Sequence, residues 1–313
     1  MKIAVTGATG FIGRALCSHL AIVDDYIVVP AVSHVSGLPH EIVVGNNNAT
    51  MDWRSVLARC EAVVHLGARV HRMDMTPRNP LALYRASNTD TTLNLARQAT
   101  ESGVKRFVFI STAKVNGEGR ESPYTEIDPA TPEDAYAISK WEAEQGLHQI
   151  ARETGLEVVV LRPPLVYGPG VTANFLNMMR WLYKGVPLPL GAIHNRRSLV
   201  GLDNLVDFIV ICLDHPAATN QTFLVGDGED ISTTDLLRRM AEALKVPARL
   251  IPVPQNLLEA SLKLIGKNAL AHRLCGSLRL DISKAETVLD WHSPLSVHEG
   301  LQRTADYFLQ GRS

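Results

Sequence analysis

A tyrosine and a lysine four residues apart, Tyr136 and Lys140, are the side chains in this sequence with the clearest chemical potential. The segment around them has helical character and follows Pro132, so both side chains should share one face of a helix. An ammonium group beside a phenol favours the phenolate and lowers the pKa of the phenol. We therefore expect Tyr136 to exchange protons near neutral pH, although such pairs also occur on ordinary helix surfaces.

Three glycines near the N-terminus, Gly7, Gly10 and Gly13, follow a short apolar run at residues 3–5 and precede a helical pattern. Gly7 would permit a tight turn, Gly10 the approach to a pyrophosphate, and Gly13 close packing of helix on strand. The helix dipole favours negative charge at that place. The spacing is not G-x-G-x-x-G and would also suit a plain glycine-rich connection. Together with the tyrosine–lysine pair, it favours a dinucleotide-binding enzyme.

The elements that must position these residues alternate between strands and helices in the first half of the chain. This alternation predicts an α/β fold with a Rossmann-type, doubly wound parallel sheet. The expected strands cover residues 2–5, 26–32, 41–44, 62–66, 106–111 and 157–161, and the expected helices cover residues 11–20, 53–59, 81–102, 134–153 and 175–183. The proline-rich second half predicts a smaller C-terminal substrate lobe. There we expect helices at residues 203–213 and 233–244 and a strand at residues 221–225.

The order of the elements suggests two interleaved domains. We expect residues 1–165 to form the dinucleotide-binding domain, with residues 198–226 returning to it. Residues 166–313 should form mainly the substrate lobe.

Composition limits the classes of partner. The chain has 313 residues, is 46% hydrophobic and 20% charged, and carries a formal net charge of -1. It therefore lacks a basic field that would recruit nucleic acid or an anionic membrane. The four cysteines are far apart, which indicates core residues and not a disulfide framework. No apolar leader or membrane-spanning stretch is apparent, so we expect a cytoplasmic protein.

The motifs together resemble the extended short-chain dehydrogenase/reductase family, also called the NAD-dependent epimerase/dehydratase family. The resemblance covers nearly the whole chain and rests on TGATGFIG at residues 6–13, HLGA at 65–68, FVFIST at 107–112, YAISK at 136–140 and LRPPLVYGP at 161–169, with Asn88 and Arg197. Within the family, residues 114–117 and 162–170 look most like bacterial O-antigen UDP-sugar 4-ketoreductases. UDP-glucose 4-epimerases are the next most similar.

The resemblance implies a catalytic triad of Thr112, Tyr136 and Lys140. Thr112, which follows an expected buried strand, would orient the sugar oxygen, Tyr136 would transfer the proton, and Lys140 would bind the nicotinamide ribose. The remaining cofactor-binding residues would be Gly7, Thr9, Gly10, Phe11, Ile12, Gly13, Ser33, His34, Asn46, Asn47, Leu66, Gly67, Ala68, Asn88, Ile110, Ser111 and Pro163. The substrate-binding residues would be Thr112, Lys114, Asn174, Leu190, Arg197 and Arg273. No metal is expected, because His65 and His71 lack ligand partners at suitable spacing.

The preferred cofactor is read from the end of the second expected strand. NAD-preferring sites carry an Asp or Glu there, whereas this chain carries Ser33 and His34. A hydroxyl or an imidazole can bond a 2′-phosphate that a carboxylate would repel. Because no arginine is present either, the pattern favours NADPH over NAD without deciding between them.

The first interpretation of the function is a UDP-sugar 4-ketoreductase that reduces a UDP-4-keto-6-deoxy-N-acetylhexosamine for O-antigen synthesis. The alternative is a UDP-hexose or UDP-N-acetylhexosamine 4-epimerase with tightly bound NAD. Leu165 stands where 4-epimerases usually carry Asn, which argues for the reductase. A non-catalytic dinucleotide sensor is a remote third interpretation.

Two further expectations follow from the family pattern. Dehydratases carry an acidic pair directly after the active-site Thr, and Ala113 and Lys114 stand there instead, which argues against dehydration. A homodimer is expected to form through the helices at residues 81–102 and 134–153.

Overall fold

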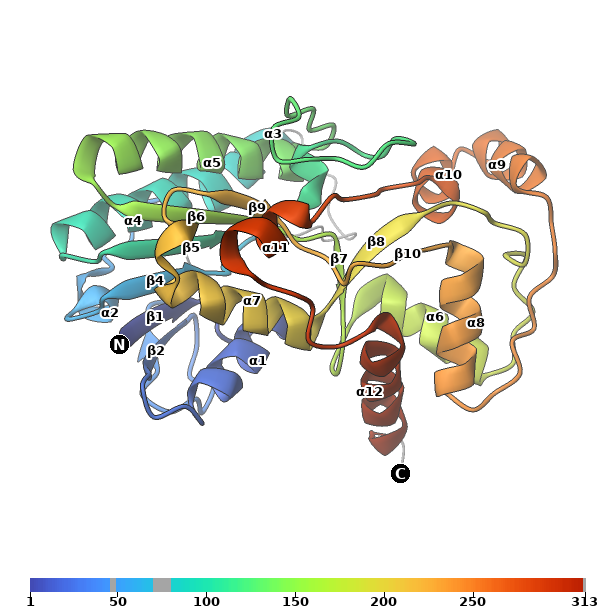
Figure 1. Ribbon diagram of the computed structural model, residues 1–313, viewed down its shortest axis with the longest axis horizontal. Helices are drawn as coiled ribbons and strands as arrows, with labels where there is room; N and C mark the ends of the chain where they lie inside the picture. Colours follow the sequence, from blue (N-terminus) through green and yellow to red (C-terminus); the bar gives the residue numbers. More distant parts are fainter. Residues whose placement is uncertain (46–48, 70–79, 312–313) are drawn as a thin grey trace.

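The structure is a computed structural model that describes residues 1–45, 49–69 and 80–311. Its centre is a seven-stranded sheet with the strand order β3-β2-β1-β4-β5-β6-β9 (Figure 1). The strands are β1 (Lys2–Thr6), β2 (Ile27–Val32), β3 (Ile42–Val43), β4 (Ala62–His65), β5 (Arg106–Ile110), β6 (Glu157–Arg162) and β9 (Thr222–Leu224). Every neighbouring pair is parallel. The order reverses between β1 and β4, so the predicted doubly wound sheet is confirmed.

Helices cover both faces of this sheet (Figure 1). On one face lie α1 (Phe11–Leu20) and α7 (Leu202–Asp214), whose apolar residues pack into one core cluster with alternate strand residues. On the other face, α2 (Arg54–Leu57), α4 (Thr91–Glu101) and α5 (Ala135–Thr154) contribute to a second cluster. Strands buried on both faces must be apolar throughout, which explains the unbroken hydrophobic runs in β5 and β6.

The helix that we expected at residues 81–102 is not one continuous α-helix. It consists of α3 (Pro80–Tyr84), a π-helical segment (Arg85–Asp90) and α4. Asn88 lies in the π-helical segment and is buried, with its side-chain amide bonded to neighbouring segments. A π-turn of this kind redirects a side chain within a helix, and such turns are frequent at functional sites.

The second half of the chain forms a smaller lobe around its own hydrophobic core. A three-stranded sheet with the order β10-β8-β7 joins β7 (Leu165–Tyr167), β8 (Arg197–Gly201) and β10 (Asp230–Ile231). Around it lie α6 (Ala173–Tyr183), α8 (Thr233–Ala243), α9 (Gln255–Leu264), α10 (Asn268–Cys275) and α12 (Val297–Gln310). The helix α11 (Ser283–Leu289) instead packs beside β9 and contributes to the core cluster of the main sheet.

The chain passes between the two sheets more than once. The predicted strand near residues 221–225 is confirmed as β9, which pairs with β6 in the main sheet. The preceding strand β8 pairs with β7 in the smaller sheet instead. Strands of the two sheets therefore alternate along the chain, and α7 leads from β8 back to the main sheet (Figure 1).

The four cysteines are buried and unpaired, as the sequence predicts. Within the described ranges, no helix is long and apolar enough to cross a membrane. The same residues contain no group of three or more metal-ligating side chains that could hold an ion.

Candidate active site

The glycine turn between β1 and α1 packs so closely that side chains are excluded. Gly7 has a φ of +68°, and a Cβ atom on it would lie 2.7 Å from the amide nitrogen of Gly67. A Cβ atom on Gly13 would lie 2.2 Å from the carbonyl oxygen of Gly7. Gly10 begins α1 without a side-chain cap, so the first amides of the helix have no acceptor inside the helix. This cradle fits a diphosphate group, which needs close backbone approach and free N–H donors.

A buried histidine at the end of β4, together with the loop that follows, contacts the end of β1 beside this cradle. His65 Nδ1 is 2.5 Å from Thr6 Oγ1, and His65 Nε2 is 2.9 Å from Thr92 Oγ1. Thr6 Oγ1 also accepts a hydrogen bond of 3.3 Å from the amide of Gly67. Burial, together with the nearby Lys140, lowers the pKa of His65 to about 3, so its imidazole is neutral. His65 therefore acts as a neutral link between β1, β4 and α4.

The predicted catalytic residues lie near the carboxyl edge of the main sheet. Thr112 directly follows β5, and its Oγ1 accepts a hydrogen bond of 3.3 Å from the amide of Lys114. Tyr136 and Lys140 lie in the first two turns of α5, whose N-cap residue is Asp134. The Asp134 carboxylate caps this helix by accepting a hydrogen bond of 2.7 Å from the amide of residue 137.

Lys140 is buried, and its pKa is lowered towards neutral pH. Its side chain is 1% exposed, with Nζ 4.0 Å from the centroid of the Phe109 ring. Burial lowers the pKa of Lys140 to about 7, and the carboxylate of Glu144 opposes this shift. The expectation that the pKa of Tyr136 is lowered is wrong for this structure. Burial raises it, and the nearby Asp134 and Tyr84 raise it further.

Asn88 connects three segments around the site. Its Oδ1 accepts a hydrogen bond of 2.7 Å from the amide of Arg69, and its Nδ2 donates to the Arg69 carbonyl at 3.2 Å. Nδ2 also donates to Ser139 Oγ at 3.0 Å. Because Ser139 adjoins Lys140, the Asn88 side chain ties α5 to the loop after β4.

Two carboxylates converge on Lys114, one from the same loop and one from a separate segment. Its Nζ lies 2.7 Å from Glu118 and 2.8 Å from Asp134. No carboxylate directly follows Thr112 in the sequence; Glu118 reaches Lys114 within the local loop, and tertiary folding adds Asp134. Burial lowers the pKa of Arg197, at the start of β8, and the charge of Glu118 opposes that shift. Arg197 is partly buried, and its neighbour Arg196 is exposed.

The other predicted site residues divide between the main sheet and the smaller lobe, to which Asn174 in α6, Leu190 and Arg273 in α10 belong. Ser33 and His34 are exposed at the end of β2, with His34 Nδ1 3.0 Å from Ser33 Oγ. The predicted residues Asn46 and Asn47 lie outside the described residues. The rest comprise exposed Thr9, Ala68, Asn174 and Arg273, partly buried Phe11, Ile12 and Leu66, and buried Ile110, Ser111, Pro163 and Leu190.

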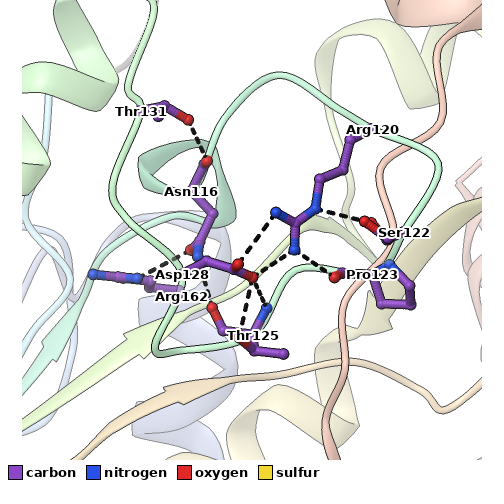
Figure 2. A network of polar contacts seen from close by, with 8 residues as sticks. All are labelled: Asn116, Arg120, Ser122, Pro123, Thr125, Asp128, Thr131 and Arg162. Carbon is purple, nitrogen blue, oxygen red and sulfur yellow. Dashed lines mark hydrogen bonds and ion pairs between the residues drawn. The ribbon is translucent and has the colours of Figure 1, made fainter.

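A buried polar network behind β5 was not anticipated from the sequence. Ser111 Oγ donates to Glu144, whose carboxylate is paired with Arg162 at 2.5 Å. Arg162 Nη1 donates to Asn116 Oδ1 at 3.0 Å, and Asn116 anchors the loop that carries Thr125 (Figure 2). The available signal was the position of Glu144, four residues after Lys140 and on the same helical face.

Comparison with known proteins places this architecture in a family. Residues 3–226 match the model of the NAD dependent epimerase/dehydratase family. The whole chain is 48% identical over 319 residues to a protein of Vibrio cholerae named UDP-glucose 4-epimerase, of which it covers 97%. The chain therefore belongs to the NAD dependent epimerase/dehydratase family.

Solved structures agree with this assignment. The UDP-glucose 4-epimerase of Thermotoga maritima, solved with UDP-glucose, is 25% identical and covers all of both chains with a TM-score of 0.77. The UDP-glucuronic acid 4-epimerase of Bacillus cereus, solved with NAD, is 22% identical with a TM-score of 0.80, covering 99% of this chain and 97% of its own. This second likeness supports the fold alone.

Proposed function

We propose that the protein is a UDP-sugar 4-epimerase that works with NAD. The observation that carries the proposal is the 48% identity, over the full chain, to a relative named UDP-glucose 4-epimerase. The sequence alone placed this function second. The 4-ketoreductase that it placed first, and the preference for NADPH, find no support among the relatives described above.

The residues at the carboxyl edge of the sheet fit NAD. The close-packed Gly7, Gly10 and Gly13 leave room and backbone donors for its diphosphate. At the end of β2, exposed Ser33 and His34 offer hydrogen-bonding groups to the adenosine ribose. Bound NAD would supply the capacity to accept and return a hydride, and this chemistry belongs to the cofactor.

The side chains of this chain would handle the proton and the orientation of the sugar. Thr112 would hold the oxygen at the reacting carbon, and Tyr136 would remove its proton and later return it. Removal requires the raised pKa of Tyr136 to fall in the working complex, and a positive charge beside the phenol has that effect. Lys140 is the cationic side chain of the proposed triad, and it is partly protonated at neutral pH.

We propose Arg197 as the main ligand of the UDP diphosphate. It is partly buried, Nη1 donates to the Gly276 carbonyl at 2.9 Å, and a guanidinium matches phosphate oxygens. The remaining substrate contacts proposed are Lys114, Asn174, Leu190 and Arg273. The smaller lobe would therefore bind the UDP moiety while the main sheet binds the cofactor.

The proposal is tested by incubating the purified protein with UDP-galactose, without added reduced nicotinamide, and following UDP-glucose by chromatography. We expect conversion to an equilibrium mixture with no net change in absorbance at the reduced-nicotinamide band. Tyr136→Phe should lose roughly a hundredfold or more of kcat, because it removes the proton-transfer group. Tyr26→Phe is the matched control, since the Tyr26 hydroxyl bonds Asp214 away from the site.

One result would replace this function with the ketoreductase. That result is the absence of interconversion for UDP-glucose and UDP-N-acetylglucosamine with NAD supplied, together with oxidation of NADPH by a UDP-4-keto-6-deoxy sugar. The lack of a carboxylate at the end of β2 favours this second candidate.

A further inference from the structure

We propose that Glu144 and Arg162 form a buried positioning pair that holds Thr112 and Lys140 in their working arrangement. The pair would act through its neighbours and would not touch the substrate. The activity tests of this proposal rest on the 4-epimerase function proposed above, whereas the unfolding test does not.

The pair is closed off from water and has a defined geometry. Glu144 lies one turn after Lys140 in α5 and is 0% exposed, while Arg162 ends β6 and is 4% exposed. Arg162 Nε donates to both carboxylate oxygens at 3.1 Å, and Nη2 donates to Oε2 at 2.5 Å. Several N–H donors on one carboxylate fix the direction of both side chains. The pair therefore ties the catalytic helix to β6.

The same pair holds the segment around Thr112 from both sides. Ser111, which directly precedes Thr112, donates its hydroxyl to Glu144. On the other side, Arg162 Nη1 donates to Asn116 Oδ1, at the end of the short turn that begins at Thr112 (Figure 2).

The Asn116 end of this network is itself anchored to the following loop (Figure 2). Asn116 Nδ2 donates to the Thr125 carbonyl at 2.9 Å, and its own carbonyl accepts from Thr131 at 2.6 Å. Because Asn116 is 0% exposed, no water competes for these bonds. A change at Glu144 would therefore be transmitted to both flanks of Thr112.

The pair also supplies the negative charge that acts on Lys140. Among the described residues, the Phe109 ring from β5 lies against Lys140, neutral His65 from β4 is close to it, and Tyr136 lies one turn earlier in the same helix. Burial and Glu144 act on the pKa of Lys140 in opposite directions, and the carboxylate favours the ammonium form. The Asp134 carboxylate raises the pKa of Tyr136, which lies near it at the start of α5. Without the Glu144 charge, Lys140 should lose its proton at a lower pH.

The first test compares kcat/KM profiles across pH for the wild type and Glu144→Gln. Glutamine keeps the shape of the side chain and removes its charge. We expect the alkaline limb to move to lower pH, and a drop of about one unit in the pKa of Lys140 makes the ratio of activity at pH 8 to activity at pH 6 fall about fivefold. The matched control is Glu157→Gln, which breaks the Arg106–Glu157 pair at the other ends of β5 and β6. A uniform loss of activity at every pH in Glu144→Gln would overturn the proposal.

A second variant separates hydrogen bonding from charge. Ser111→Ala removes the bond to Glu144 but leaves the carboxylate in place. We expect a lower kcat with an unmoved pH profile. An alkaline limb that moves as far as in Glu144→Gln would contradict the assigned charge effect.

The last test measures the pH dependence of unfolding and needs no enzymatic activity. It therefore remains valid if the proposed 4-epimerase function is wrong. Because the folded-state pKa of Lys140 lies below its ordinary value, unfolding takes up a proton above about pH 7, and stability should rise with pH from there. In Glu144→Gln this rise should begin at a lower pH, as measured by urea unfolding, and in Glu157→Gln it should begin where it does in the wild type. The same onset in all three proteins would overturn the proposal.

Discussion

Two buried or partly buried ion pairs lie at opposite ends of the neighbouring strands β5 and β6, and they differ in exposure to water and in the segments they contact. Arg106 and Glu157 begin β5 and β6, with the Glu157 side chain 39% exposed. Arg162 and Glu144 lie near the opposite, carboxyl ends of those strands, and the Glu144 side chain is 0% exposed. Water can therefore replace the partner of one carboxylate but not of the other.

The two pairs also connect to different parts of the molecule. Arg106 Nη1 donates to the carbonyls of Cys212, Leu213 and His215, at the end of α7, so it ties a strand to a covering helix. Arg162 donates instead to Asn116, in the loop of the candidate site. In doubly wound sheets, ligands bind beyond the carboxyl ends of the strands. We therefore expect the Arg106–Glu157 pair to stabilise packing at the amino ends of the strands and the Arg162–Glu144 pair to position residues of the candidate site at the carboxyl ends.

The largest expected effect comes from removing each arginine. Arg162→Met would leave Glu144 charged and buried without its partner, which should lower the free energy of unfolding by about 3–5 kcal/mol. Arg106→Met leaves Glu157 in contact with water and frees backbone carbonyls, at a cost of about 1–3 kcal/mol. Urea unfolding of both variants measures the difference. Equal losses would show that the two edges do not differ as the burial indicates.

A smaller effect is expected from adding one methyl group to a glycine at each edge. A Cβ atom on Gly13 would lie 2.2 Å from a backbone oxygen, so Gly13→Ala should cost about 1–3 kcal/mol of stability and weaken NAD binding. Gly103, after α4 at the amino edge, has a φ of +80° and open space around its Cβ position. Gly103→Ala should therefore cost only about 1 kcal/mol and leave NAD affinity unchanged. Calorimetric titration with NAD gives the decisive comparison.

A further effect at the carboxyl edge is the pH dependence that His65 gives to the free energy of unfolding. The pKa of His65 is about 3 in the folded protein, below its ordinary value, because the ring is buried. The unfolded chain therefore binds the proton first, and stability should fall as the pH drops from about 6.5 towards 3. His65→Gln should show a shallower fall in the free energy of unfolding between pH 7 and pH 4. Parallel curves for the two proteins would contradict the burial of a neutral imidazole.

Local patterns predicted the main sheet well but the continuity of one helix and the smaller lobe less well. Residues 11–20 read as a helix and form α1 over that range, because their apolar spacing matches the burial of one helical face. The segment at residues 81–102 has the same helical composition, yet its π-turn depends on bonds from Asn88 to residues elsewhere in the chain. The strands β7 and β10 have three and two residues, too few for a period-2 pattern, so the partners of β8 and the smaller sheet were not predicted.

The sequence by itself determined the glycine cradle, the tyrosine–lysine pair on α5 and the alternation that builds a parallel sheet, because each depends on residues close together in the chain. Only the tertiary structure decided that Glu144 pairs with Arg162, that Asp134 reaches Lys114, and that the pKa of Tyr136 is raised. These outcomes depend on burial and on distances between separate segments. Both quantities are set when helices, strands and loops pack around the carboxyl edge of one sheet, and neither is encoded in local spacing.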